Sequence, residues 1–450
     1  MALFREYDIR GIVGQELTAP VAEQIGRAFA TVARDQGAKT MTVGRDGRDS
    51  SPALRDRLIR GLTDGGLDVI DIGIVPTPVL YFSLFHLNAD GGVMITGSHN
   101  AAEYNGFKLC LGKEALHGED IQQLKKVMEA GKFSSGVGGV TEQPMLPEYL
   151  AYLKQNFAAV KGDSLHVVID CGNGAAGLVA EQAMAQLGCR VTGLYCDVDG
   201  KFPNHHPDPT VVENLKDLIR TVKETGADVG IGYDGDADRI GAVDEQGNIL
   251  WGDRLMVIFS RDILASRPGS TILSEVKASQ SLYDDIRKHG GRPIMWKTGH
   301  SLIKAKMKEE GAVLAGEMSG HMFFAEGFYG HDDALYGAAR LLRIIAEDGR
   351  PLSAMLGDVP TFIATPEIRI DVPEARKFAI VADAVRHFRA RHDVIDVDGV
   401  RVLYGDGWGL LRASNTQPVL VARYEARTPE RLQAIRAEME GWLRAQGVSV

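Results

Sequence analysis

A serine on a turn, followed ten residues later by a lysine, is the first feature of this chain that could do chemistry. The run Ile95-Thr96-Gly97-Ser98-His99-Asn100 follows the apolar stretch 92–95, and Lys108 stands ten positions beyond the serine. A serine hydroxyl becomes a good nucleophile when a base removes its proton or a metal polarises its partner. Lys108 and His99 could give that help. The segment therefore predicts a serine that accepts and donates a phosphoryl group.

Two other interpretations compete for the same segment. Gly-Ser-His-Asn after a strand is often an ordinary turn with a helix cap. A serine hydrolase is disfavoured, because Asn100 occupies the position of the second glycine in the Gly-x-Ser-x-Gly pattern of esterases.

Three aspartates at alternate positions form a second candidate site. Asp234, Asp236 and Asp238 stand in the run Asp-Gly-Asp-Ala-Asp-Arg, which ends at Arg239. If the backbone is extended, this spacing points all three carboxylates to one side. Clustered carboxylates repel one another unless a cation lies among them, and oxygen ligands in a small loop suit Mg²⁺. We expect a magnesium site, with Arg239 as a phosphate contact or a salt-bridge partner.

A calcium-binding EF-hand is an alternative for this loop, because Glu245 falls at the twelfth position when Asp234 is counted as the first. Two features oppose it. Arg239 stands where that loop requires glycine, and the flanks 228–232 and 240–243 have the pattern of strands rather than helices. A solvated acidic hairpin is the remaining alternative.

A third loop carries Glu317, Ser319 and His321, again at alternate positions. A carboxylate, a hydroxyl and an imidazole on one face suit hydrogen bonds to vicinal sugar hydroxyls. The glycines of the loop let the backbone come close to a ligand. A plain polar turn is the alternative.

A fourth loop combines groups that match the oxygens of a phosphate. It contains a guanidinium, two hydroxyls and an amide, supplied by Arg412, Ser414, Asn415 and Thr416. Arginine can bind phosphate in a bidentate manner. A turn closed by Pro418 is the alternative.

Repeated strand-turn-helix units surround these loops. A strand is predicted at 40–44, followed by a turn and a helix from 51 to 65, and the pattern restarts with strands at 165–170 and 270–273. His331-Asp332-Asp333 is expected to open a helix, with its carboxylates at the N-terminus. Such alternation predicts largely parallel sheets covered by helices, with ligands beyond the carboxyl ends of the strands. We expect three related α/β domains with mixed or parallel sheets.

The last part of the chain has a different pattern. Alternating, half-buried strands are predicted at 368–372, 394–400 and 419–424, with a closing helix from 428 to 445. This pattern indicates a smaller C-terminal α+β domain. The expected domain limits are 1–145, 146–249, 250–361 and 362–450, so that each domain carries one of the four loops.

Bulk properties narrow the class of protein. The 450 residues exceed what one core usually supports, and a net charge of −10 argues against general nucleic-acid binding. The four cysteines lack zinc-type spacing and are expected to be reduced thiols. No apolar run approaches the length of a membrane span and no secretory segment opens the chain, so we expect a cytoplasmic protein without a membrane partner.

The four loops, together with Phe4-Arg-Glu-Tyr-Asp-Ile-Arg-Gly11, resemble those of the α-D-phosphohexomutase family, especially its bacterial phosphomannomutase/phosphoglucomutase group. The motifs occur in the family's order over essentially the whole chain. The resemblance implies four domains around a central cleft, the first three alike in topology and the fourth related to a TATA-binding-protein-like fold. It leaves the oligomeric state as monomer or dimer.

The resemblance also implies roles for the matching positions. Ser98 would carry the phosphoryl group and would share the Mg²⁺ ion with Asp234, Asp236 and Asp238. The residues that would line the reaction centre are Tyr7, Arg10, Lys108, Arg239 and His300, with Lys108 the favoured general acid or base. Lys277 would contact the ligand. Glu317 and Ser319 would hold the sugar's O3 and O4 beside His321. The fourth loop (Arg412, Ser414, Asn415, Thr416) would hold the phosphate that is not reacting.

The serine loop departs from the family in one respect. The family usually has proline after the asparagine of this loop, whereas Ala101-Ala102 follow Asn100 here. This departure lowers the expected stiffness of the serine loop.

The reaction that the resemblance implies interconverts hexose 1-phosphate and hexose 6-phosphate, of mannose, glucose or both. It runs through a phosphoserine, with hexose 1,6-bisphosphate as intermediate and activator. Met318 favours this group over phosphoglucosamine mutases, which more often have glutamine there, although such a mutase stays an alternative. A sugar phosphatase that uses the same phosphoserine and a non-catalytic sugar-phosphate sensor are the alternatives from other classes.

Overall fold

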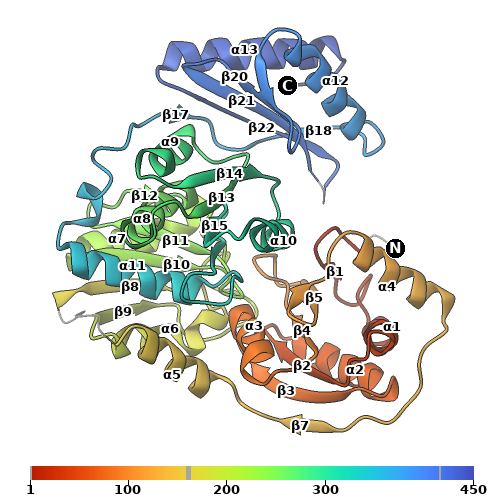
Figure 1. Ribbon diagram of the computed structural model, residues 1–450. Coiled ribbons are helices and arrows are strands. Elements are labelled where there is room, and N and C mark those ends of the chain that lie inside the picture. The colour runs from red at the N-terminus through yellow and green to blue at the C-terminus, as the bar shows by residue number, and fades with distance from the viewer. Residues whose placement is uncertain (1–2, 159–163, 415–416) are drawn as a thin grey trace.

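The computed structural model describes residues 3–158, 164–414 and 417–450, which form four sheets arranged in an arc (Figure 1). The first sheet has the strand order β1-β5-β4-β2-β3-β7, with β6 paired to β5. Its strands are Ile9–Ile12 (β1), Thr40–Arg45 (β2), Asp68–Ile74 (β3), Gly91–Ile95 (β4), Tyr104–Leu111 (β5), Glu114–Ala115 (β6) and Val140–Glu142 (β7). The helices of this part are Ala19–Asp35 (α1), Ser51–Asp64 (α2), Thr77–His86 (α3) and Glu119–Ala130 (α4).

The second and third sheets are smaller. The second has the order β12-β11-β10-β8-β9 and the third β14-β13-β15-β16. The strands of the second are His166–Asp170 (β8), Arg190–Leu194 (β9), Val229–Tyr233 (β10), Ile240–Asp244 (β11) and Ile249–Leu250 (β12). Those of the third are Thr271–Glu275 (β13), Arg292–Trp296 (β14), Leu314–Gly316 (β15) and Met322–Phe324 (β16). The helices of these parts are Leu146–Asn156 (α5), Ala180–Gln186 (α6), Lys216–Thr225 (α7), Gly252–Ser266 (α8), Gln280–Lys288 (α9), His300–Glu310 (α10) and Ala334–Asp348 (α11).

These three sheets share one topology. In each, three parallel strands stand in the order second, first, third, and a fourth strand runs antiparallel beside the third. The connection from the third to the fourth strand carries a predicted loop each time: Ser98 between β4 and β5, Asp234–Asp238 between β10 and β11, and Glu317–His321 between β15 and β16. The prediction of three related α/β domains is confirmed, and their loops are topologically equivalent.

The fourth sheet is wholly antiparallel, in the order β17-β22-β21-β20-β19 with β18 paired to β22. Its strands are Ile363–Ala364 (β17), Ile368–Asp371 (β18), Asp393–Ile395 (β19), Val400–Leu403 (β20), Gly407–Ala413 (β21) and Val419–Ala426 (β22). The helices Lys377–Arg389 (α12) and Pro429–Ala445 (α13) lie on its outer side (Figure 1). The expected α+β fold of this domain is confirmed.

One predicted strand of this domain is wrong. The stretch 394–400 forms parts of two strands, β19 and β20, which pair antiparallel. Between them lies a turn in which Gly399 has a φ of +83°, a conformation that glycine adopts without strain. A Cβ at Gly399 would lie 2.3 Å from the carbonyl oxygen of Leu411, so the turn requires a glycine. The alternation of apolar and polar residues over 394–400 does not reveal this turn.

The hydrophobic cores divide the molecule unevenly. One large core runs through α3, α5, the second sheet and the third sheet, so the first three domains share buried surface. Helix α3 is buried over Thr77–Leu84 and apolar on nearly every side, as expected for a helix enclosed between two domains. The fourth domain has a separate core between its sheet and α12 and α13.

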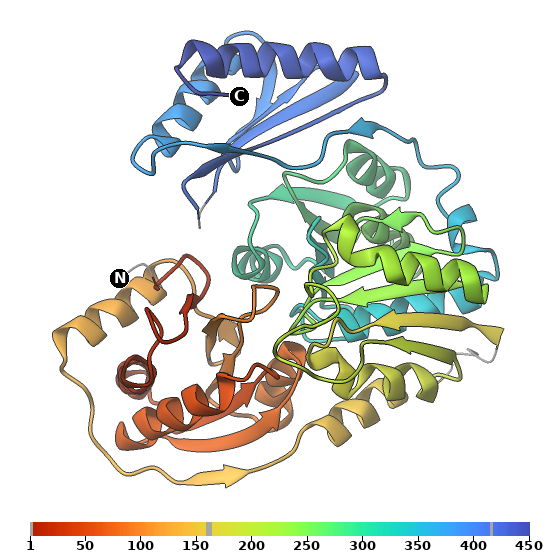
Figure 2. The same cartoon turned by 180° about the vertical axis from the view of Figure 1, so that it is seen from behind.

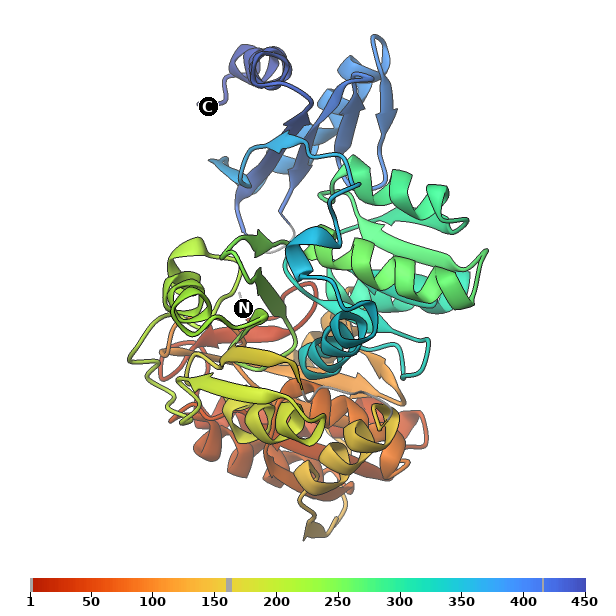
Figure 3. The same cartoon turned by 90° about the vertical axis from the view of Figure 1, so that its left-hand side faces the viewer.

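The fourth domain is joined to the third by a connecting segment (Figure 3), by hydrogen bonds and by a small buried cluster of Val276, Trp408 and Leu410. Arg401 donates from Nη1 to the carbonyl oxygens of Val276 and Ala278, at 2.7 and 2.8 Å. Glu425 accepts from the Ser279 hydroxyl at 3.0 Å. Seen from both sides, the first and fourth domains face each other across the open end of the arc, with the β21–β22 hairpin turned inward (Figures 1 and 2).

Among the described residues, every helix is too short or too polar to span a bilayer.

Candidate active site

Ser98 lies against the aspartate loop of the second domain. Its hydroxyl donates to Asp234 Oδ2 at 3.1 Å and lies 3.1 Å from His99 Nδ1. The residue is 3% exposed and has a φ of +49°, an uncommon conformation for a residue other than glycine. Burial, reinforced by Arg239, lowers the pKa of His99 well below its usual value. The serine and the carboxylates predicted to act with it are therefore in direct contact.

Two arginines hold the serine loop in place. Arg48, which is almost completely buried, donates to the carbonyl oxygens of Ser98, Asn100, Ala101 and Tyr104 at 2.6–3.0 Å. Arg10 donates from Nη1 to Asn100 Oδ1 at 2.6 Å. A Cβ at Gly97 would lie 2.5 Å from the Arg48 guanidinium, so glycine is required there. The loop is thus clamped by Arg48, a residue that the sequence motifs did not indicate.

The three aspartates meet in a tight turn rather than along an extended backbone, so this part of the sequence prediction is wrong. The amide of Ala237 donates to the carbonyl oxygen of Asp234 at 3.0 Å, and Ala237 has a φ of +60°. The carboxylates of Asp234, Asp236 and Asp238 are fully buried and lie within 4.8 Å of one another. The turn gathers them onto one side by folding back.

Helix α3 meets this turn with its N-terminus. Thr77 donates from its hydroxyl to Asp236 Oδ2 at 2.5 Å and from its amide to the Asp236 carbonyl oxygen at 2.9 Å. The N-terminal end of a helix carries partial positive charge and favours a nearby carboxylate. Thr77 is a second functional neighbour that the sequence motifs did not indicate.

Lys108 supplies the cation that these carboxylates need. Its ammonium contacts Asp238 and lies 2.7 Å from Asp236 Oδ2. Burial opposes its charge, but Asp236 and Asp238 outweigh burial and raise the pKa of Lys108 above its usual value. Burial, and then repulsion by Asp238 and Asp236, raises the pKa of Asp234 well above its usual range.

The aspartate turn fits a divalent cation. Within the described part of the chain, Asp236 and Asp238 each keep one buried carboxylate oxygen that receives no hydrogen bond. Unpaired buried carboxylate oxygens are costly, and an all-oxygen donor set is the one that hard cations prefer. The acidic cluster can therefore hold a metal ion.

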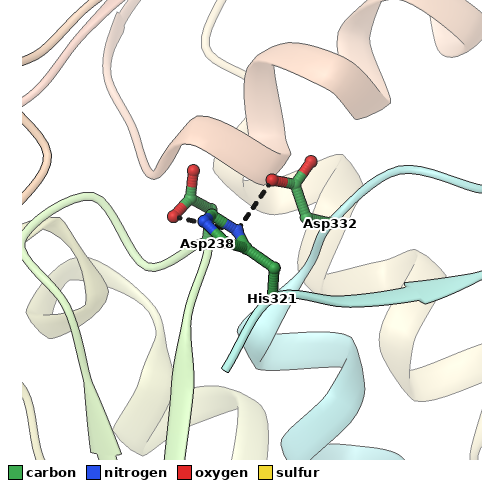
Figure 4. Close-up of side chains that lie close together, drawn as sticks. All are labelled: Asp238, His321 and Asp332. Atoms are coloured by element: carbon green, nitrogen blue, oxygen red, sulfur yellow. Dashed lines mark ion pairs between the residues drawn. The ribbon is translucent and has the colours of Figure 1, made fainter. Parts of the chain in front are cut away.

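His321 belongs to the same charged cluster (Figure 4). Arg239 donates from Nε to His321 Nε2 at 3.0 Å, so the ring proton lies on Nδ1. Nδ1 faces Asp332 Oδ2 at 3.0 Å and Asp238 Oδ1 at 3.5 Å. Asp332 in turn pairs with Lys304 at 2.9 Å.

Glu317, Ser319 and His321 do not lie on one face of an extended backbone. The expectation drawn from their alternate spacing is corrected here. The loop is another tight turn, with Gly320 at a φ of +93° and its amide bonded to the Glu317 carbonyl oxygen. Ser319 donates to Glu317 Oε2 at 3.1 Å. His321 instead bonds with Arg239 of the aspartate turn.

The start of helix α10 joins the loop 317–321 to the first domain. This loop is called the sugar loop below, after its predicted role. Glu317 Oε1 accepts from the amide of Gly299 at 2.6 Å. Tyr7 donates from its hydroxyl to the carbonyl oxygen of Thr298 at 3.0 Å, and its ring lies 5.8 Å from that of His300. Burial, reinforced by Lys304, lowers the pKa of His300 well below its usual value. The structure thus brings Tyr7, His300 and Glu317 close together.

Arg412, predicted to bind the remote phosphate, and Lys277, predicted to contact the ligand, are both paired with carboxylates. Arg412 donates from Nε to Asp398 Oδ2 at 2.9 Å, and Lys277 lies 3.2 Å from Glu367 and 3.5 Å from Glu275. The hydroxyl of Ser414 accepts from the amide of Gln417 at 3.2 Å. Asn415 and Thr416 lie outside the described residues.

Comparison with known proteins matches the whole chain to one family. Models of the alpha/beta/alpha domains I, II and III of phosphoglucomutase/phosphomannomutase match residues 1–135, 147–247 and 251–362, and the model of the C-terminal domain matches 367–441. A phosphomannomutase/phosphoglucomutase of Pseudomonas aeruginosa is 50% identical over 445 residues, which cover 99% of this chain and 96% of that protein. A phosphoglucomutase of Neisseria meningitidis is 45% identical over 443 residues, with 97% of this chain and 96% of that protein covered.

A solved structure agrees with these matches. The crystal structure of a phosphoglucomutase/phosphomannomutase family protein from Burkholderia thailandensis has a TM-score of 0.92 and 42% identity, and the match covers 99% of this chain and 97% of that one. The expected α-D-phosphohexomutase resemblance is confirmed, and the chain belongs to the phosphoglucomutase/phosphomannomutase family.

Proposed function

We propose that this protein interconverts hexose 1-phosphates and hexose 6-phosphates, with Ser98 as the residue that carries the phosphoryl group. The contact between the Ser98 hydroxyl and Asp234, 3.1 Å long and fully enclosed, is the observation that carries the proposal. In this contact a serine hydroxyl lies against a buried carboxylate cluster that is suited to a metal ion, which supports a nucleophilic role for the serine. The mutase names of the relatives point to the same activity.

The reaction has two transfers. Phospho-Ser98 gives its phosphoryl group to the free hydroxyl of the substrate. The serine O–P bond breaks, a bond from phosphorus to the sugar oxygen forms, the sugar hydroxyl proton passes to a base, and the serine oxygen takes up a proton from an acid. The resulting hexose 1,6-bisphosphate turns around and returns its other phosphoryl group to Ser98. Lys108 is the favoured acid or base, and Arg10, Arg239 and His300 complete the reaction centre.

The aspartate turn would hold Mg²⁺ through Asp234, Asp236 and Asp238, with Ser98 as a further ligand. Bound there, the ion offsets the negative charge of the group in transfer, while positioning supplies most of the rate. The carboxylates are already gathered by their turn and by Thr77. Little rearrangement of the chain is then needed for the ion to bind.

The remaining residues would hold the sugar and its second phosphate. Glu317 and Ser319 would bind O3 and O4 beside His321 and Tyr7, which leaves C2 without a contact and admits both mannose and glucose. The proposed remote phosphate ligands are Lys277, Arg412, Ser414, Asn415 and Thr416. We further propose the domain limits 1–145, 146–249, 250–361 and 362–450, a cytoplasmic location, and a monomeric or dimeric state.

A coupled assay with glucose, mannose and glucosamine 1-phosphates tests the proposal, in the presence of Mg²⁺ and a trace of hexose 1,6-bisphosphate. Turnover of the glucose and mannose compounds, and its loss in Ser98→Ala, is the expected result. A preference for the glucosamine compound would favour a phosphoglucosamine mutase, and release of free phosphate in place of isomerisation would favour a phosphatase. Inactivity on all three compounds, or full turnover by Ser98→Ala, would contradict the proposal.

A further inference from the structure

Thr298 is bonded to three separate parts of the molecule. Its carbonyl oxygen accepts from the Tyr7 hydroxyl of the first domain at 3.0 Å. Its amide donates to Asp398 Oδ2 of the fourth domain at 3.0 Å. Its hydroxyl donates to the carboxylate of Glu275, at the end of β13 in the third domain. All three polar groups of this residue are therefore used, each toward a different domain.

Two of the partners of Thr298, Asp398 and Glu275, also contact residues proposed to bind the ligand. Asp398 accepts from Arg412 Nε at 2.9 Å. Glu275 is completely buried, accepts from the amide of Met318 in the sugar loop at 3.0 Å, and lies 3.5 Å from Lys277. One residue thus connects the remote phosphate loop with the sugar loop and Lys277.

The neighbouring glycine makes this close approach possible. Gly299 has a φ of +130°, and a Cβ there would lie 2.5 Å from the ring of Tyr7. Its amide donates to Glu317 Oε1 at 2.6 Å. The segment 298–300 is consequently fixed from several sides, and the Thr298 hydroxyl is the side-chain part of that fixation.

We propose that Thr298 is a positioning residue that keeps the Arg412 loop, the sugar loop and Tyr7 in register for one ligand. The side-chain bond to Glu275 determines where the Thr298 amide and carbonyl stand, and these groups in turn place Asp398 and Tyr7. The kinetic part of the test rests on the proposed mutase function; the structural part does not.

The test compares Thr298→Val, which removes the hydroxyl while keeping the shape, with Thr298→Ser, which keeps the hydroxyl. Thr271→Val is the matched control, because Thr271 begins the same strand that Glu275 ends and its hydroxyl accepts a local bond from Arg292 of the neighbouring strand at 3.0 Å. The readouts are KM and kcat for glucose 1-phosphate, release of hexose 1,6-bisphosphate into solution, and amide hydrogen exchange at Thr298 and over 4–9 and 396–399.

Loss of a hydrogen bond to a buried carboxylate is expected to raise KM for Thr298→Val about 10-fold or more, with increased release of bisphosphate. Amide exchange at Thr298, over 4–9 and over 396–399 should become faster in Thr298→Val. Thr298→Ser should restore KM and the exchange rates to within about 2-fold of the parent protein. Unchanged exchange in Thr298→Val, or equal impairment of the Val and Ser variants, would overturn the proposal. If the parent protein lacks mutase activity, the proposed function fails, and the exchange results still decide the role of Thr298.

Discussion

The two ends of the proposed site are built in different ways. At the reaction end, Lys108 and its aspartate partners are 0–6% exposed and belong to domains that share one large core. At the remote end, the side chains of Arg412 and Asp398 are 7% and 13% exposed, and those of Lys277 and Glu367 are 12% and 32% exposed. These residues join the third domain to a fourth domain that has its own core.

Under the proposed function, the difference fits a reaction end that is fixed for chemistry and a remote end that exchanges ligands. The carboxylates of the reaction end are held by Lys108, Thr77 and their own turn before any metal binds. The cations of the remote end are paired with carboxylates, and we expect an incoming phosphate to compete with these carboxylates. A site in which a bisphosphate turns around must release and rebind phosphate at one end while the other stays in place.

Replacing Lys108 by Met tests the fixed end. Three buried carboxylates would lose their cation, which is expected to destabilise the metal-free protein by about 3–5 kcal/mol. Thermal unfolding in EDTA should show this loss, and added Mg²⁺ should recover part of it, because a bound cation again offsets the carboxylates. The rate constant kcat should fall about 100- to 1,000-fold.

Lys308→Met serves as the control, since that side chain is 75% exposed. An equal melting temperature for Lys108→Met and the parent protein in EDTA would show that the reaction end is not organised by this charge.

Replacing Arg412 by Ala tests the exchangeable end. The loss of a charge-assisted contact to the remote phosphate should raise KM about 10- to 100-fold and release bisphosphate and free phosphate into solution. Arg386→Ala on the exposed side of α12 is the control, and steady-state kinetics with a phosphate-release assay are the measurement. Unaltered KM would remove Arg412 from the remote site.

Replacing Arg48 by Lys tests whether Arg48 holds the serine loop rigid, although Ala101-Ala102 stand where the family usually has proline. An ammonium cannot reach the four carbonyl oxygens that the guanidinium serves, so the serine loop should loosen. We expect kcat to fall about 10-fold with little change in KM for the sugar phosphate, since the remote end is unaltered. Arg57→Lys on the same helix region is the control. A rise in KM alone would be inconsistent with this role.

Replacing Glu367 by Gln should have the smallest effect, and it should lower KM rather than raise it. Although burial opposes it, Lys277 lowers the pKa of Glu367, so this carboxylate competes with phosphate for the lysine. Removing its charge should lower KM about 2- to 3-fold. Glu374→Gln, at an exposed position before α12, is the control. An increase in KM would mean that Glu367 positions Lys277 rather than masking it.

The sequence predicted the elements that lie close together along the chain more fully than the contacts that cross between domains. Strands, helices and all four loops follow from local periodicity and turn residues. Asp333 caps α11 as expected, accepting from the Tyr336 amide at 2.8 Å. Its neighbour Asp332, predicted for the same helix start, instead pairs with His321 and Lys304.

The missed residues have partners far away in the sequence. Arg48 lies in a turn and Thr77 begins the apolar helix α3. Asp398 lies in a stretch that was predicted as a strand. Their bonds join residues 50 to 159 positions apart, so no local pattern could reveal them. The backbone of the aspartate turn was missed for another reason: alternate spacing fits an extended strand and a tight turn equally well.

A single-turnover experiment can follow the phosphoryl group of Ser98 through the proposed reaction. Protein labelled with isotopic phosphate on Ser98 is mixed with unlabelled glucose 1-phosphate and Mg²⁺, and the label is followed by mass spectrometry. We predict that the label leaves Ser98 only when the sugar is present, and that it appears on hexose 1,6-bisphosphate and then on glucose 6-phosphate. Label that never resides on Ser98, or that leaves as free phosphate at the same rate without the sugar, would contradict the account.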